Sequence, residues 1–183
     1  MNESINKFSK LITELVLQRE NLKESLTIWN NASDSEIMQC EETLKTKLPE
    51  SYKVFIKKYG MLVFLGDEFI GSENPNVTLN NRSHNLSPYS YNFPKNFVSV
   101  YKLGNGDEFC LDTSQMKNNE CPVVSWPSYN EDGSYDFISE SFGDFILETV
   151  WNNLIAEGVE LSQYQHLKPK NKGWNYEENN NRE

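Results

Sequence analysis

The first sixty residues carry apolar side chains at helical spacing. One helix is expected to begin after Ser33, because Ser33 and Glu36 have the spacing of a capping box. Pro49 suits the first turn of the next helix along the chain, and Gly60 would end that helix with a left-handed cap. Before them, residues 4–27 predict one amphipathic helix, since apolar side chains recur there at steps of three and four: Ile5, Phe8, Ile12, Leu15, Val16, Leu22 and Leu26.

The pattern then changes to short strands. Gly104-Asn105-Gly106 predicts a hairpin turn, and the Asn-, Ser- and Pro-rich residues 72–95 predict a long loop. A final helix is expected over 141–156, capped by Ser139 or Ser141. The expected strands cover residues 61–65, 68–70, 97–103, 107–111, 122–126 and 135–138. This order predicts a single α+β domain, with N-terminal helices, a mostly antiparallel multi-stranded sheet and a C-terminal helix packed on it.

Charge separates the chain into unequal parts. The 183 residues have a formal net charge of −10, yet residues 1–105 carry 12 acids and 12 bases. Residues 106–160 carry 12 acids and one base, Lys117, so the whole excess lies in this segment. Such a balance argues against binding to nucleic-acid phosphates or to anionic membranes, and it suits basic protein partners or simple solubility.

Cysteine usage and hydropathy indicate a cytoplasmic protein. Cys40, Cys110 and Cys121 are odd in number and show no CxxC spacing, so we expect free, mostly buried thiols in a reducing compartment. We see no signal peptide, and the longest apolar stretch, residues 61–65, is far shorter than the ~18 residues of a membrane span.

Catalytic and metal-binding motifs are weakly supported. The two histidines, His84 and His166, have no neighbouring ligand or nucleophile signature. The carboxylates between Asp107 and Asp112 are separated by apolar residues, as a strand requires and a calcium loop does not. Gly104-Asn105-Gly106 lacks the third glycine of a dinucleotide fingerprint. We therefore predict no enzyme activity, no catalytic residues, no cofactor and no metal site.

Several motifs, in their order and spacing, resemble the SUKH superfamily (Smi/Knr-like) over about residues 28–155. The resemblance is carried by Trp29, the helix start at 33–37, Glu41 or Glu42, Leu48-Pro49-Glu50-Ser51-Tyr52-Lys53-Val54-Phe55, Tyr59-Gly60, the hairpin at 100–112, Cys121-Pro122-Val123-Val124 and Ser141-Phe142-Gly143-Asp144-Phe145-Ile146. It implies a domain at 28–157, preceded by a helical extension at 1–27 and followed by a tail at 158–183.

The resemblance also implies a function. Bacterial members of this superfamily resemble immunity proteins of polymorphic toxin systems, which bind and neutralise a cognate toxin that is often a nuclease. Fungal relatives are regulatory proteins. We therefore expect an acidic, protein-binding antitoxin of unknown oligomeric state that binds neither nucleic acid nor membranes. The alternative is a regulatory or scaffold module of the same fold with a non-toxin partner.

The acidic segment and its aromatics supply the candidate partner-binding residues. Nucleases are basic where they hold phosphate, so a concentrated negative surface could cover such a site. Trp126 and Tyr129 flank a Pro-containing turn, where we expect them to be exposed in an interface. The candidate residues are Asp107, Glu108, Trp126, Tyr129, Glu131, Asp132, Asp136 and Glu140.

Overall fold

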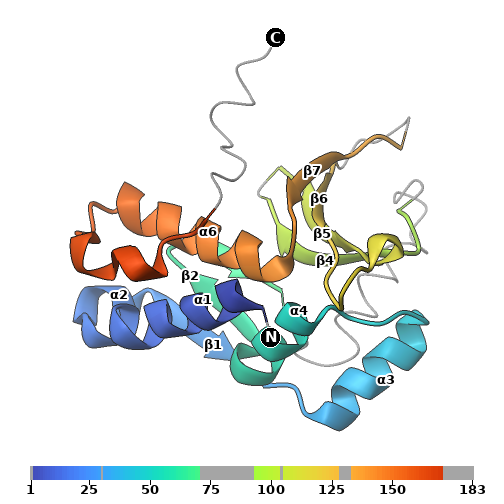
Figure 1. The fold of residues 1–183 in the computed structure, drawn as a ribbon, viewed down its shortest axis with the longest axis horizontal. Helices are drawn as coiled ribbons and strands as arrows, with labels where there is room; N and C mark the ends of the chain where they lie inside the picture. The colour runs from blue at the N-terminus through green and yellow to red at the C-terminus, as the bar shows by residue number, and fades with distance from the viewer. Residues whose placement is uncertain (1, 30, 71–92, 104, 128–132, 171–183) are drawn as a thin grey trace.

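The computed structural model describes residues 2–29, 31–70, 93–103, 105–127 and 133–170. It confirms the predicted α+β domain, in which N-terminal helices and a C-terminal helix pack on an antiparallel sheet (Figure 1). The strands of this sheet follow each other in chain order, β1-β2-β3-β4-β5-β6-β7, and every neighbouring pair is antiparallel. Their bounds are β1 Leu26–Trp29, β2 Met61–Phe64, β3 Asp67–Phe69, β4 Phe97–Lys102, β5 Glu108–Asp112, β6 Val123–Trp126 and β7 Asp136–Ser139.

Two of the helices begin at the capping residues that the sequence predicts. Ser33 and Glu36 form the capping box of α3, and Ser141 caps α6 by accepting a hydrogen bond from the Asp144 amide. Helix α4 ends at Gly60, whose φ of +62° is costly for residues with a Cβ atom. The α-helices are α1 Glu3–Glu14, α2 Glu20–Glu24, α3 Asp34–Leu44, α4 Glu50–Tyr59 and α6 Phe142–Ala156; the 3₁₀ helices are η1 Val16–Gln18, η3 Thr113–Gln115 and η4 Ser162–Leu167.

The single helix predicted over residues 4–27 is wrong. The chain forms α1, η1 and α2 in succession and then enters β1, which pairs with β2 at the edge of the sheet. The apolar spacing explains the break: Val16 and Leu22 are six residues apart, so a continuous helix would turn them to different faces, whereas both are buried here. At the end of this segment, the β-branched and aromatic residues of Thr27-Ile28-Trp29 favour a strand.

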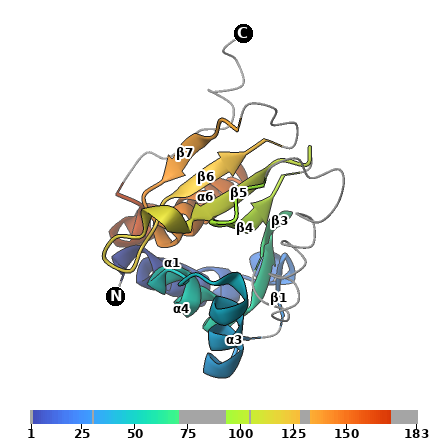
Figure 2. The ribbon, with the colours of Figure 1, turned by 90° about the vertical axis from the view of Figure 1, so that its right-hand side faces the viewer.

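Helix α6 lies between α1 and the sheet and is buried along most of its length (Figures 1 and 2). Phe142 contacts Phe55 and Tyr52 of α4, with ring centroids 5.0 Å apart in both pairs. A Cβ atom on Gly143 would lie 2.8 Å from the Asn2 side chain and 3.1 Å from the Ile5 amide nitrogen, so this glycine allows α1 to approach α6. The apolar side chains of the N-terminal helix α1 are therefore part of the domain core.

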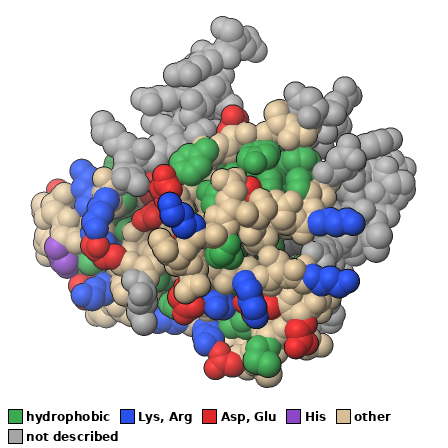
Figure 3. All heavy atoms as spheres, turned by 45° about the vertical axis from the view of Figure 1, so that its right-hand side comes forward, with side chains coloured by type: hydrophobic (Ala, Val, Ile, Leu, Met, Phe, Trp, Pro, Cys, Tyr) green, Lys and Arg blue, Asp and Glu red, His purple; other side chains and the backbone are tan. Residues whose placement is uncertain are grey.

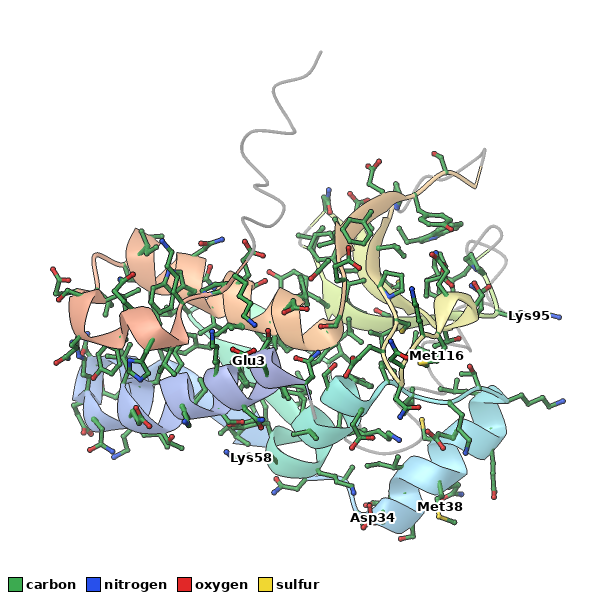
Figure 4. The ribbon with its side chains drawn as sticks, viewed as in Figure 1. Glu3, Asp34, Met38, Lys58, Lys95 and Met116 are labelled. Carbon is green, nitrogen blue, oxygen red and sulfur yellow. The ribbon has the colours of Figure 1, made fainter. Side chains whose placement is uncertain are left out.

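The segment from 158 to 170, predicted as part of a tail, packs onto the domain. Leu161 and Leu167 are buried in the main core, and the Tyr164 hydroxyl donates to the Glu14 carbonyl oxygen at 3.2 Å. Lys170 forms an ion pair with Glu3, which lies at the start of α1 (Figure 4). The structure differs from the expected tail here because the two leucines bury apolar surface in the core, beside α1, that would otherwise face water. Residues 171–183 lie outside the described residues.

Helix α3 stands apart from the main body of helices in two views (Figures 1 and 2). Its links to α4 include ion pairs of Lys57 with Asp34 and of Lys53 with Glu41. Met38, on its outer part, is 59% exposed (Figure 4). The capping box, the exposed Lys57–Asp34 pair, which is weak, and the pair of Lys53 with the buried Glu41 support a helix that buries only a narrow stripe of side chains.

The expected thiol state is confirmed, since Cys40, Cys110 and Cys121 are all free and buried. Burial raises the pKa of the Cys121 thiol to about 12, and it raises the pKa of the Cys110 thiol well above its ordinary value. Within the described part of the chain, none of the helices has the length and apolar character needed to cross a membrane.

A polar junction joins the starts of α1, α4 and α6 to the turn before β6. The Glu120 carboxylate accepts from the Ser51 amide at 3.0 Å and from the Ser51 hydroxyl at 2.6 Å. The Gly143 amide donates back to the Ser51 hydroxyl at 3.2 Å. Burial raises the pKa of Glu120, an effect that hydrogen bonds from Ser51 and Asn2 oppose and the nearby Asp144 reinforces.

This junction predicts that the free energy of unfolding depends on pH through Glu120. Because the pKa of Glu120 is raised on folding, the folded protein retains this proton to a higher pH than the unfolded chain does. The stabilisation linked to this proton is fully present below the ordinary pKa of a carboxyl group. It is lost as the pH rises through the pKa that Glu120 has in the folded protein. In Glu120→Gln, the free energy of unfolding should therefore fall less between about pH 4 and pH 7 than in the wild type.

Urea denaturation at several pH values measures this difference. The matched control is Glu24→Gln, at an exposed carboxylate of α2, and it should follow the wild-type profile. A Glu120→Gln profile parallel to that of the wild type would contradict the assignment.

Candidate partner-binding surface

Three of the predicted acidic residues lie at one end of the sheet. Glu108 begins β5 and Asp136 begins β7, while Asp107 directly precedes β5. Phe109, Ser125 and Asp136 form one row across β5, β6 and β7, so the starts of β5 and β7 are at the same end. The structure thus brings Asp107, Glu108 and Asp136 to a common end of the sheet, named here the acidic end.

These carboxylates do not all lie on one face. Glu108 is opposite Trp126, whereas Asp136 is in the row of Phe109, and successive side chains alternate between faces. Phe109 belongs to the core under α6. Asp136 is therefore on the α6 side of the sheet, and Glu108 is on the opposite side.

The remaining candidates are placed differently. Glu140 follows Ser139, which pairs with Val123, so Glu140 lies at the other end of β7 from Asp136. Tyr129, Glu131 and Asp132 lie outside the described residues.

Trp126 is buried, so the expectation that it is exposed is wrong. It is 6% exposed and lies on the sheet face opposite α6 with Phe97, Cys110 and Val124. Its ring centroid is 5.6 Å from that of Phe97, with the rings nearly perpendicular. Trp126 is the last residue of β6 and not part of the following turn, so strand alternation directs it into this second apolar cluster.

The exposed aromatics of this region are on β7 and just before it. Tyr135 is 44% exposed and Phe137 is 55% exposed. Hydrophobic side chains gather in the upper part of the surface in Figure 3, where β6 and β7 lie in Figure 1. The sequence prediction missed Phe137, and strict alternation along 135–138 could have identified it, because Ile138 faces the core.

On the other face, a groove of about 320 Å³ runs between α6 and the sheet. Its apolar lining includes Tyr101, Phe109 and Phe145. Two carboxylates line it, Asp67 from β3 and Glu148 from α6. Since Phe109 and Asp136 share a row, the carboxylate of Asp136 is on the same side of the sheet as this α6 groove.

Asp67 connects three elements at one side of the α6 groove. Its carboxylate accepts one hydrogen bond from the Tyr101 hydroxyl of β4 and another from the side-chain amide of Asn153 on α6. Burial, and then the bond to Asp67, raise the pKa of Tyr101, so its hydroxyl stays protonated and continues to donate. These contacts hold β3, β4 and α6 in fixed relation along the groove.

The sequence prediction missed the α6 groove. Glu148 and Asn152 are four residues apart on a helix whose other positions are mostly apolar, which places them on one face. That spacing was the available signal for a polar face on α6. The contribution of β3 could not be read locally, because Asp67 and Asn153 are 86 residues apart in the chain.

The described part of the site offers binding surfaces. Among the residues that the structure describes, no group of three or more histidine, cysteine, aspartate or glutamate side chains could hold a metal ion. The features that remain are an acidic sheet end, two exposed aromatics and an acidic groove with an aromatic floor.

The chain matches the family model SUKH_5, described as SMI1-KNR4 cell-wall, over residues 1–152. This match covers most of the 183 residues. It begins at residue 1, so it includes the N-terminal helix, which lies outside the resemblance seen in the sequence motifs.

The second apolar cluster predicts different roles for two neighbouring aromatics. Trp126→Ala should lower the free energy of unfolding by about 3–5 kcal/mol, because it removes a large buried side chain. Phe137→Ala, on the same sheet face but more than half exposed, should cost less than about 1 kcal/mol. Urea denaturation of both variants tests this, and equal losses would contradict the assignment.

Proposed function

Because the chain belongs to the SUKH superfamily, with an SMI1-KNR4-type domain, we propose that it is an immunity protein that binds and neutralises a cognate toxin. The toxin proposed is a domain with a basic, phosphate-binding active site, as nucleases have. The proposed compartment is the cytoplasm, where such a toxin would act. The family supports a binding role in place of a catalytic one.

The observation that carries this proposal is the acidic end of the sheet. Glu108 and Asp136 begin two strands separated by β6, Asp107 directly precedes Glu108, and the three therefore lie at one end of the sheet. Glu108 and Asp136 lie on opposite sheet faces, and Lys102, which pairs with Glu108, offsets one of the three negative charges at this end.

Physical chemistry favours such an arrangement for an inhibitor. Opposite charges steer two proteins together and raise association rates by roughly 10–10³-fold at low salt. The bound state is then stabilised by apolar contacts, which exposed Tyr135 and Phe137 could supply beside the charged residues. A fast association suits a protein that must capture a toxin before the toxin acts.

Co-expression tests the function directly. The protein is produced together with the C-terminal domain of a large toxin gene next to its own, and both growth and co-purification are followed. Rescue of growth with recovery of a complex supports immunity. Failure of both would favour the alternative, a regulatory or scaffold module of the same fold with a non-toxin partner.

The acidic end itself is tested by charge reversal. We expect Asp107→Lys, Glu108→Lys and Asp136→Lys, combined, to slow toxin association by about 10–100-fold at low salt and to flatten its salt dependence. Stopped-flow measurement over a range of ionic strength gives both quantities.

A matched control changes the net charge equally at exposed sites on three N-terminal helices: Glu14→Lys, Glu24→Lys and Glu42→Lys. This control should keep most of the wild-type association rate, and both triple variants are checked for unchanged thermal unfolding. Equal slowing in both would show that only the net charge matters.

A further inference from the structure

We propose that the β1 edge, the outer side of strand Leu26–Trp29, binds the β1 edge of a second copy of this chain in an antiparallel contact that joins the two sheets. The proposal does not depend on the proposed function. Strands β1 and β7 are the two edges of the sheet, and no described strand pairs with the outer side of β1 (Figure 2). Such an edge presents main-chain donors and acceptors to a strand that can align with it.

The register of β1 and β2 identifies the main-chain groups that point outward. The Leu65 amide donates to the Ser25 carbonyl oxygen at 3.4 Å, so these two residues form a hydrogen-bonded pair at the start of the ladder. Such pairs occur at every second position of an antiparallel ladder, so Thr27 also directs its main-chain groups to β2. The amide and carbonyl groups of its neighbours Leu26 and Ile28 therefore point to the open edge.

These outward groups are complementary to their own copies. When a two-fold axis passes beside Thr27, Leu26 of one copy lies opposite Ile28 of the other. Each such pair exchanges both of its main-chain hydrogen bonds, as hydrogen-bonded pairs do in an antiparallel ladder. The outward groups of Leu26 and Ile28 are then all satisfied by a symmetric contact, in which the same surface serves both copies.

The side chains agree with this register. Leu26 pairs with Phe64 and Ile28 pairs with Leu62, so Leu26 and Ile28 lie on the face of the sheet that belongs to the main core. Ile28 is nevertheless 39% exposed, and Leu26 of a second copy would cover it. Thr27 lies on the other face, opposite Thr27 of the second copy, and threonine pairs are favourable across antiparallel strands.

Charge favours the β1 edge over the edge formed by β7. Residues 106–160, which include β7, carry 12 acids and one base, whereas residues 1–105, which include β1, carry 12 of each. Strand β7 begins with Asp136, and a register shift interrupts its pairing with β6, while β1 has neither a charged residue nor a register shift. Charges and bulges protect sheet edges from pairing, so β1 is the less protected edge.

Sedimentation velocity of the full-length protein over a range of concentrations tests the proposal. The wild type should show a concentration-dependent equilibrium between monomer and dimer. Thr27→Lys and Thr27→Glu should each weaken dimerisation by about tenfold, because like charges then face each other across the axis. An equimolar mixture of the two variants should dimerise again, because opposite charges then face each other.

The matched controls are Gln39→Lys and Gln39→Glu, at an exposed position of α3, and both should dimerise as the wild type does. Cross-linking reports the register itself. Partners that do not share hydrogen bonds have Cα atoms about 4.5 Å apart, which permits a disulfide. Thr27→Cys should therefore oxidise to a covalent dimer, whereas Gln39→Cys should not, and the native thiols are buried and do not compete.

Several results would overturn the β1 dimer. They are a wild type that stays monomeric up to about 1 mM, equal dimerisation of all four charge variants, and equal cross-linking of both cysteine variants. A monomer that loses toxin binding in Thr27→Lys would also overturn it, and would assign the β1 edge to a strand of the toxin. The proposed function fails separately: if no adjacent toxin is bound while the Thr27 variants behave as expected, immunity is excluded and the dimer stands.

Discussion

The burial of α6 is the constraint on which the rest of the structure depends. This helix has the sheet on one side and α1 on another, and its buried side chains occupy most of its circumference. Such a helix would expose a large apolar area if either neighbour were absent, so the sheet and the N-terminal helices must form together around it. Gly143 allows the close approach of α1. Ser51, which bonds to Glu120 and to the Gly143 amide, connects the start of α4 to the same place.

The surfaces proposed for binding follow from this packing. The strands of the described sheet are antiparallel neighbours in chain order, so alternate strands begin at the same end of the sheet. The starts of β5 and β7 therefore meet at one end, which concentrates part of the negative segment there. Helix α6 covers the adjacent face without filling it completely, and the carboxylates of Asp67 and Glu148 remain at the groove that is left.

Local signals in the sequence predicted the starts of α3 and α6 and most strands, because capping residues, glycine and apolar alternation act within a few residues. Ser33 with Glu36, Ser141 and Gly60 each behave as their local chemistry requires. The predictions failed where a distant partner decides the outcome. Leu26 continues the helical spacing, but pairing with Phe64 places it in a strand. Leu161 and Leu167 were predicted as part of a tail, because nothing near them in the sequence indicates that they enter the core beside α1.

The three buried thiols have a consequence for experiments on this protein. A thiol reacts as its thiolate, and burial with a raised pKa keeps Cys110 and Cys121 protonated and out of reach of reagents. Cys40 is on α3, Cys110 is in the middle of the sheet, and Cys121 lies just before β6. Alkylation of each cysteine should therefore report how often its own region opens, so the native chain carries three built-in probes of local unfolding that need no engineered label.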